Sequence, residues 1–243
     1  MSIGAKFELI ADAVYDKGKQ AEHDAFWDVY QQNGERTTYQ NAFSCGWSTS
    51  LFKPKYLIKP GSGNYQAKEM FYWFGSGSEP PLDWRTVADK IDLSSVTDAT
   101  SLFNSARINY IDVDLSNATT LWGCFNCEWQ ITGRTHLTLK VSEKCKEYTV
   151  AFGYCAELTH LFFMDGSKIA ASVSVSSATG LVKDSIESIV SALWDGASGK
   201  TLTLSLTAVK KAFETSSGAN DGNTSEEWLA LVASKPNWTI TLA

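Results

Sequence analysis

Apolar residues recur at helical spacing at the start of the chain. Residues 1–36 contain two such sets, one formed by Phe7, Ile10, Ala11 and Val14 and the other by Phe26, Val29 and Tyr30. Apolar residues three or four positions apart share one face of a helix. The pattern predicts two amphipathic helices that cover one end of the fold as an N-terminal cap, with Gly18 and Gly34 near the helix ends.

From residue 37 to residue 180 the period changes to two. Short alternating runs start at Ile91, Val113, Leu137 and Leu161, so they begin 22, 24 and 24 residues apart. Alternation points every second side chain to the same face, which is typical of a strand. We therefore expect one short strand in each of these units.

A second feature recurs between the strands, where a phenylalanine is followed closely by small, aromatic or sulfur-containing residues. It occurs at Phe103–Ala106, Phe125–Cys127 and Phe152–Cys155, with weaker copies at Phe43–Cys45 and Phe71–Phe74. Self-similarity at roughly 20–30 residues indicates stacked repeats that share one core. The sequence therefore predicts an α/β leucine-rich-repeat solenoid of short parallel strands and irregular returns. Phenylalanines and cysteines are expected to fill the interior of each turn.

Residues 181–243 have a different pattern. Asp184–Glu187 and Thr224–Glu227 each match the capping box that begins a helix. Thr201–Leu206 and Trp238–Leu242 alternate as strands, and Ala208–Phe213 has the pattern of a short helix. We expect an α/β C-terminal cap that closes the open end of the solenoid within one continuous domain.

These residues also resemble a known family. The phenylalanine–cysteine turns and the I-D-L strand resemble BspA-type leucine-rich repeats. The segments FELIADAVYDKGKQAEHDAFWDVYQQNGERTTYQNAF and TLTLSLTAVKKAFETSSGANDGNTSEEWLALVASKPNWTITLA are similar to the two ends of small repeat proteins encoded by phages and prophages of gut bacteria. The chain departs from a regular repeat at Cys124–Trp129, where the spacing from aromatic to cysteine is shorter.

The resemblance implies a role in a virion. Genes of this kind lie near tail and other virion genes, so a tail, baseplate or fibre component that serves host attachment or assembly is implied, rather than a capsid protein. Other virion proteins, or a protein or glycan on the host cell surface, would be the partners, and the chain could form a homo-oligomer. No catalytic motif of the family maps onto these residues.

Charge and composition narrow the choice of partners. A net charge of −6 provides no basic surface for nucleic acid or for an anionic membrane. No segment approaches the roughly 18 apolar residues that cross a bilayer, so membrane insertion is not expected. Glu8, Asp12 and Asp16 interrupt the N-terminal region, and the five cysteines are an odd number. The chain is therefore expected to be made in the bacterial cytoplasm without a signal peptide and to end in a virion.

Two aspartates could in principle catalyse glycoside hydrolysis. Asp112 and Asp114 alternate with Ile111, Val113 and Leu115, so both carboxylates should lie on the outer face of a strand, roughly 6.5–7 Å apart. That separation is compatible with an acid/base pair, but one carboxyl group would need a pocket that raises its pKa. We interpret the pair as part of a solvated face and predict a protein without catalytic activity or cofactor.

Metal binding is a second hypothesis from this region. Cys124, Cys127, Cys145, Cys155 and His136 could supply zinc ligands, but structural zinc sites usually join two close pairs, and the later cysteines are isolated. The segment 220–227 resembles a calcium loop but does not match its spacing. We therefore expect no metal site, with the cysteines acting as core residues.

The remaining candidate is the outer surface of the strands. The outward positions Asp112, Asp114, Thr138, Lys140, Thr159 and His160 should line up across adjacent repeats, and such faces commonly bind partners. Trp47, Trp73, Trp122 and Trp129 are either interior or exposed. Exposed tryptophans would favour an alternative function, an adhesin-like or carbohydrate-binding module without a role in a virion.

Overall fold

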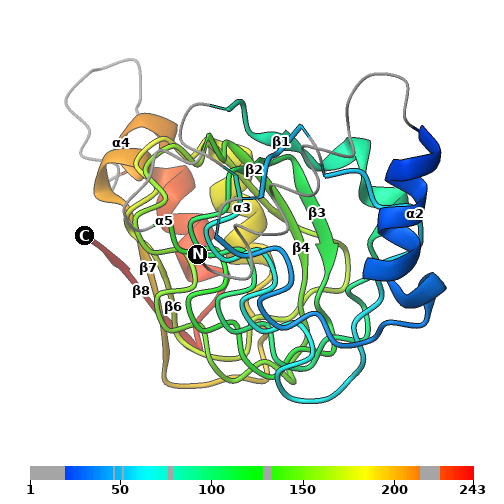
Figure 1. Ribbon diagram of the computed structural model, residues 1–243. Coiled ribbons are helices and arrows are strands. Elements are labelled where there is room, and N and C mark those ends of the chain that lie inside the picture. The colour runs from blue at the N-terminus through cyan, green and yellow to red at the C-terminus, as the bar shows by residue number, and fades with distance from the viewer. Residues whose placement is uncertain (1–19, 46, 51, 76–78, 128–132, 214–224) are drawn as a thin grey trace.

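The protein has a mixed α/β fold built from short parallel strands (Figure 1). The computed structural model describes residues 20–45, 47–50, 52–75, 79–127, 133–213 and 225–243. The first expected helix, with Phe7, Ile10, Ala11 and Val14, lies outside the described residues, as does Trp129. Across the described residues the buried apolar side chains form one continuous cluster that extends from Trp27 to Trp238.

Within the described ranges, eight strands form three small sheets, all of them parallel. β1 (Leu82–Asp83) pairs with β2 (Ile108–Asn109). The central sheet has the order β3 (Ile111–Asp114), β4 (His136–Lys140) and β5 (His160–Phe163). The third has the order β6 (Val173–Val175), β7 (Lys200–Leu204) and β8 (Trp238–Leu242).

The central sheet confirms three of the four predicted strands. Ile111, Leu137 and Leu161 lie side by side in register and are buried, because each is the inward residue of its alternating run. The run at Ile91–Leu93 does not form a strand, since Ile91 makes only a single parallel bridge to Ile58. Alternation correctly predicted that the side chains of Ile91 and Leu93 are buried. The segment around Ile58 pairs with this run at one residue alone, so no strand forms.

Five buried phenylalanines stack through the interior between the sheets. This phenylalanine ladder consists of Phe43, Phe71, Phe103, Phe125 and Phe152. Consecutive ring centroids are 5.3, 5.4, 5.6 and 5.7 Å apart, with interplanar angles of 29°, 4°, 12° and 7°. The prediction that these phenylalanines fill the interior is confirmed.

The backbone around each of these phenylalanines has the same conformation. We call residues 41–45, 69–73, 101–105, 123–127 and 150–155 the phenylalanine turns. The residue two positions before each phenylalanine has a positive φ of 45–59°: Asn41, Glu69, Ser101, Gly123 and Val150. Two positions after, a positive φ recurs in four of the five turns: Cys45, Trp73, Ser105 and Tyr154.

Main-chain hydrogen bonds hold successive turns together. Phe43, Phe71, Phe103 and Phe125 each donate the backbone N–H, over 2.8–2.9 Å, to the carbonyl that precedes the next phenylalanine along the ladder. The turns therefore align residue by residue, even though their sequences differ.

The N-terminal end is covered by α2 (Gln20–Tyr30) and the short helix η1 (Gln32–Gly34), at the right of Figure 1. Trp27 and Tyr30 are buried against Phe43, whose ring lies 6.4 and 5.7 Å from theirs. The prediction that Val29 shares the packed face is wrong, because its side chain is 81% exposed. The packed face contains Trp27 instead, which is three residues before Tyr30 and so lies on the same side of the helix.

The opposite end contains the third sheet together with α4 (Leu206–Phe213) and α5 (Glu226–Ala233), at the left of Figure 1. Strand β8 lies at the predicted residues. The cap of α5 is Ser225, whose side chain accepts from the N–H of Trp228, so the predicted capping box is shifted by one residue.

Helix α3 (Lys183–Ser191) covers the edge of the central sheet. The hydroxyl of Ser185 accepts from the N–H of Leu161 at 3.0 Å, and that of Ser188 accepts from the N–H of Phe163 at 2.9 Å. These bonds satisfy backbone donors that an edge strand would otherwise leave open. The helix begins at Lys183 with Val182 at the cap, so Asp184 lies in the first turn and is not the predicted cap.

No helix in the described part of the chain has the length and apolar character needed to cross a membrane.

The short helices η2 (Trp84–Thr86) and η3 (Ala88–Lys90) follow β1 and lead to Ile91. They bring Arg85 next to the outer face of the central sheet.

Candidate binding surface on the central sheet

The outer face of the central sheet carries most of the predicted surface residues in two rows. Asp112 lies next to Thr138 in the strand register, and Asp114 lies next to Lys140. The Lys140 ammonium is 3.9 Å from a carboxylate oxygen of Asp114. The alignment predicted for these four residues is therefore present, and Phe162 continues the first row beyond Thr138.

His160 belongs to a third row that sequence reasoning did not identify. The imidazoles of His136 and His160 stack with centroids 4.1 Å apart and planes only 6° from parallel. Tyr110 stacks on the other side of His136 at 4.6 Å, and the guanidinium carbon of Arg85 lies 3.7 Å from the centre of the Tyr110 ring. We call Arg85, Tyr110, His136 and His160 the ring stack.

A signal for the ring stack is present in the sequence. A planar side chain directly precedes the first buried residue of each central strand, as in Tyr110-Ile111, His136-Leu137 and His160-Leu161. Residues at equivalent positions of adjacent parallel strands lie about 4.8 Å apart, which is close to stacking distance. The alternating pattern predicted runs that begin at Val113, Leu137 and Leu161. The planar residues lie before these runs, so the pattern did not include them as a row.

Threonines hold the two imidazoles in place. Thr135 Oγ1 is 2.9 Å from Nδ1 of His136, and Thr159 Oγ1 is 2.8 Å from Nδ1 of His160. Thr159 also donates to the carbonyl of Thr135. Thr159 was predicted as a contact residue, but its hydroxyl orients His160 and joins two strands.

The ring stack opposes protonation of its central imidazole. Burial lowers the pKa of His136, and the neighbouring His160 and the positive charge of Arg85 lower it further. Arg85 is itself held by Asp83, since its Nε and Nη2 donate to the two carboxylate oxygens at 2.9 and 2.6 Å. The stack therefore has a central imidazole that resists protonation and ends in one cation that is paired with a carboxylate.

The two aspartates that could form a catalytic pair have different environments. Asp112 is exposed, whereas Asp114 is half-buried and accepts from the N–H of Ser116 at 2.8 Å. Together with the Lys140 contact, this bond ties Asp114 to the end of its strand. Both side chains lie on the outer face, as predicted.

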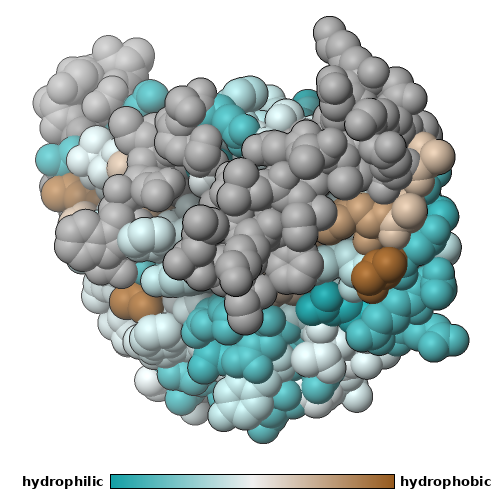
Figure 2. Space-filling model, viewed as in Figure 1, coloured by the Kyte–Doolittle hydropathy of each residue, from teal (hydrophilic) through white to brown (hydrophobic). Residues whose placement is uncertain are grey.

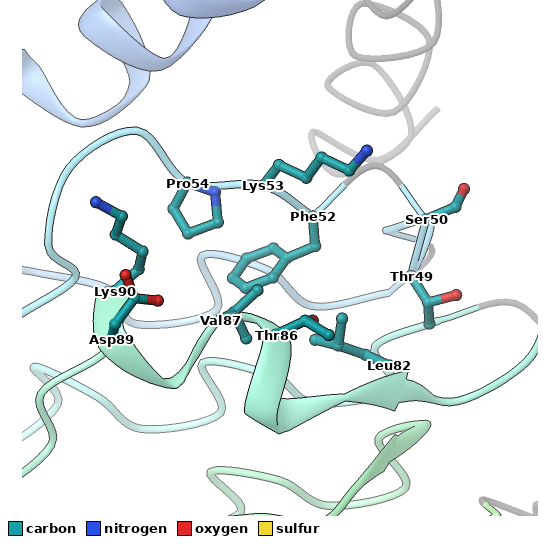
Figure 3. A pocket seen from close by; sticks show the side chains of 10 residues that line it. All are labelled: Thr49, Ser50, Phe52, Lys53, Pro54, Leu82, Thr86, Val87, Asp89 and Lys90. Atoms are coloured by element: carbon teal, nitrogen blue, oxygen red, sulfur yellow. The ribbon is translucent and has the colours of Figure 1, made fainter.

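A hollow of about 520 Å³ lies elsewhere, between residues 49–54 and 82–90 (Figure 3). Its lining is partly apolar, with Phe52, Pro54, Leu82 and Val87, and partly polar, with Thr49, Ser50, Lys53, Thr86, Asp89 and Lys90. Figure 3 shows the Phe52 ring between Pro54 and Val87, with Asp89 and Lys90 at one end of the hollow. Its two walls are about thirty residues apart in the chain, and no local pattern pointed to it.

The hydroxyls of the hollow are partly engaged by the protein itself. Thr49 donates to Glu79 and to the carbonyl of Pro80, and Thr86 donates to the carbonyl of Asp83. Asp89 and Lys90 are the charged groups at the end of the hollow and project from η3.

The proposed zinc ligands do not converge. His136 lies on the outer face of β4, whereas Cys124, Cys127, Cys145 and Cys155 are buried in the interior. Over the residues that the structure covers, no three potential ligands come together to hold a metal ion. Most of the calcium-like segment 220–227 lies outside those residues.

The tryptophans divide between core and surface. Trp47 is buried, whereas Trp73 and Trp122 are 38% and 42% exposed. Trp73 stacks on Tyr72 with ring centroids 5.8 Å apart. Figure 2 shows the apolar side chains on one face of the molecule as small separate patches within a polar surface.

Comparisons of the sequence and the structure with known proteins found no similar protein. No protein-family model matches the sequence, and neither the curated proteins nor the solved structures contain a match.

Proposed function

We propose that this chain is a leucine-rich-repeat solenoid that binds another macromolecule through the outer face of its central sheet and has no catalytic activity. The repeated backbone of the phenylalanine turns supports the solenoid, because the same two left-handed positions return in turn after turn. The in-register parallel strands of the central sheet support it as well.

The ring stack is the observation that carries the binding role. Three stacked rings, of which the two imidazoles are held by threonines, form a rigid row that loses little conformational entropy on binding. Asp112, Thr138 and Lys140 lie beside it and offer hydrogen-bonding groups of both kinds. The stacked rings cover one another's faces, so the surface presents ring edges flanked by polar groups, which can contact both sugars and exposed protein side chains.

The partner and the location follow from the resemblance to repeat proteins of phages and prophages. On that basis the chain is a virion component of the tail, baseplate or fibre, and its partner is a virion protein or a receptor on the host cell. It would be made in the bacterial cytoplasm and then built into the particle, either as a single chain or as a homo-oligomer.

Two measurements test this proposal. The first is detection of the chain in purified phage particles after the prophage is induced in a host that carries the gene. Absence of the chain from the particles would contradict the virion role. The second compares adsorption of the purified protein to host cells with that of a His136→Ala/His160→Ala variant.

Loss of the two rings should weaken adsorption about tenfold or more, as expected for residues at the centre of an interface. Lys211→Ala on the exposed side of α4 is the matched control and should bind as the original does. Equal binding of the double variant and the control would remove the ring stack from the interface.

A carbohydrate-binding module without a virion role is the second candidate, and the hollow beside Phe52 favours it. Its volume of about 520 Å³ and its mixture of apolar and charged lining are typical of small-ligand sites. Glycan binding that is lost in Asp89→Ala/Lys90→Ala but retained in His136→Ala/His160→Ala would support this function over the first. A glycosidase using Asp112 and Asp114 is a third and weaker hypothesis, and hydrolysis that disappears in Asp112→Asn would establish it.

A further inference from the structure

Two buried cysteines from adjacent phenylalanine turns lie in contact. The sulfur atoms of Cys127 and Cys155 are 3.3 Å apart, although the residues are 28 positions apart in the sequence. Neither is part of a disulfide, and both sulfurs face the carbonyl oxygen of Phe125, at 3.4 and 3.1 Å. A disulfide requires about 2.05 Å between the sulfurs, so small side-chain rotations of the two residues would suffice to form one.

The surroundings make Cys127 the more reactive of the two. The guanidinium of Arg134 is buried beside the pair, and its Nη1 lies 3.6 Å from the sulfur of Cys127. A neighbouring cation favours the thiolate, which is the reactive form of cysteine. Cys127 is 7% exposed and Cys155 is 2% exposed, so Cys127 lies nearer the protein surface.

The other buried thiols lack this combination. Cys124 and Cys145 are fully buried, and burial raises the pKa of both thiols above the usual value. Cys145 donates to the carbonyl of Glu147 at 3.5 Å. The contact with Cys127, followed by burial, raises the pKa of Cys155. Cys155 therefore keeps its proton while Cys127 reacts, and gives it up to the departing hydroxyl group of the sulfenic acid in the second step.

We propose that Cys127 and Cys155 form a disulfide when the protein meets a peroxide, and that the bond joins the fourth and fifth phenylalanine turns covalently. The Cys127 thiol loses its proton and the thiolate attacks hydrogen peroxide, so that the O–O bond breaks and a sulfenic acid forms. The released proton joins the departing hydroxide, and one water leaves. The sulfur of Cys155 then attacks the sulfur of Cys127, the S–O bond breaks, and a second water leaves. Two thiols and one peroxide thus give one disulfide and two waters.

This site does not depend on what the central sheet binds. Such a bond closes a loop of the chain between residues 127 and 155 and restricts the unfolded state. The disulfide would be reduced in the cytoplasm, and the protein would become more stable once the bond forms outside it.

The test uses the full chain with Cys45→Ser, because Cys45 is exposed and could join two molecules. This background has four of the five cysteines. Treatment with hydrogen peroxide should lower the thiol count of the denatured protein from four to two. The mass should fall by two hydrogens, and peptide mapping should join the peptides that contain residues 127 and 155. The Tm should rise by about 5–10 °C and return on reduction.

Matched variants separate this bond from other oxidation. Cys145→Ala and Cys124→Ala should still form the disulfide, whereas Cys155→Ala should accumulate a sulfenic acid at Cys127 that dimedone labels. A thiol count that stays at four in protein whose circular dichroism is unchanged would overturn the proposal. A bond mapped to Cys124 or Cys145 in the unmodified background would overturn it as well. If Cys155→Ala does not fold, peptide mapping of the background protein still decides.

Discussion

Two stacks of planar side chains cross the molecule from turn to turn, one inside and one outside. The phenylalanine ladder is buried, with neighbouring centroids 5.3–5.7 Å apart. The ring stack lies on the outer face, with neighbouring rings 4.1 and 4.6 Å apart. The closer spacing outside reflects the strand separation of about 4.8 Å, whereas the wider spacing inside reflects irregular turns that pack around bulky rings.

The comparison separates stability from binding. Removing a ring from the ladder removes buried contacts on both of its sides and leaves a cavity. Removing a ring from the ring stack exposes a surface that is already partly in contact with water. We therefore expect large losses of stability inside and small ones outside, with the reverse order for partner binding.

The largest expected effect comes from breaking the ladder at its centre. Phe103 is fully buried between Phe71 and Phe125, and its ring also contacts Trp84 at 5.4 Å. Phe103→Ala should lower the free energy of unfolding by about 3–5 kcal/mol, as measured by urea denaturation. Leu229→Ala, at an exposed position of α5, is the control and should change it by about 0.5 kcal/mol or less. A similar effect of the two changes would mean that the ladder is not the core.

The next effect concerns the cation that joins ladder turns. Arg134 is buried and donates to the carbonyls of Phe103, Ala106 and Phe125 at 2.8–3.0 Å. Arg134→Met keeps much of the volume but removes a charged donor from each of these carbonyls, so it should cost about 2–4 kcal/mol in the same urea experiment. An unchanged midpoint would show that the carbonyls find other donors.

A smaller change in stability, of opposite sign, is expected where a phenylalanine turn has a β-branched residue at a position with positive φ. Val150 is a β-branched residue with a φ of 45°, whereas the equivalent residue of the preceding turn is Gly123. Val150→Asn should stabilise the protein by about 1 kcal/mol, because asparagine tolerates the left-handed region better. Gly123→Ala should destabilise it, since the added Cβ would lie 3.3 Å from the hydroxyl of Ser101 in a left-handed backbone. Thermal unfolding followed by circular dichroism measures both changes.

The smallest expected effect is the pH dependence from the ring stack. The pKa of His136 is lower in the folded protein than its usual value of about 6.5, so the unfolded chain binds the proton more readily. Stability should therefore fall as the pH decreases from about 6.5 through the folded pKa of His136. The groups that face this imidazole are Tyr110 and His160, with Arg85 and its partner Asp83 beyond Tyr110.

His136→Phe keeps a planar ring and removes the titration. The free energy of unfolding of His136→Phe minus that of the original protein should therefore decrease as the pH rises from 5 to 8. A constant difference over that range would show that His136 titrates equally in both states. Guanidinium denaturation at each pH provides the measurement.

Sequence reasoning was most successful where the relevant pattern is short. Residues 113–115, 137–139 and 161–163 were expected as strands because alternation needs only a few residues, and all three lie in or at the ends of central strands. Strand β8 was found in the same way. The helix ends were less accurate, as Val182 and Ser225 show, because several adjacent residues could serve as caps.

The candidate site was predicted in part. Asp112, Asp114, Thr138 and Lys140 line up as expected, but Thr159 serves His160, and Tyr110, His136 and Arg85 were missed as members of the surface. Arg85 reaches the ring stack from a short helix after β1, and nothing in its own segment indicates where that helix lies.

The sequence by itself determined which side chains turn inward, because strand alternation and the aromatic repeat are local properties of the chain. Only the tertiary structure decided which of those side chains meet, because the segments between equivalent residues differ in length. The contact of Cys127 with Cys155, the three carbonyls around Arg134 and the rings of His136 and His160 all depend on the register between turns. That register is set by the packing of the whole core.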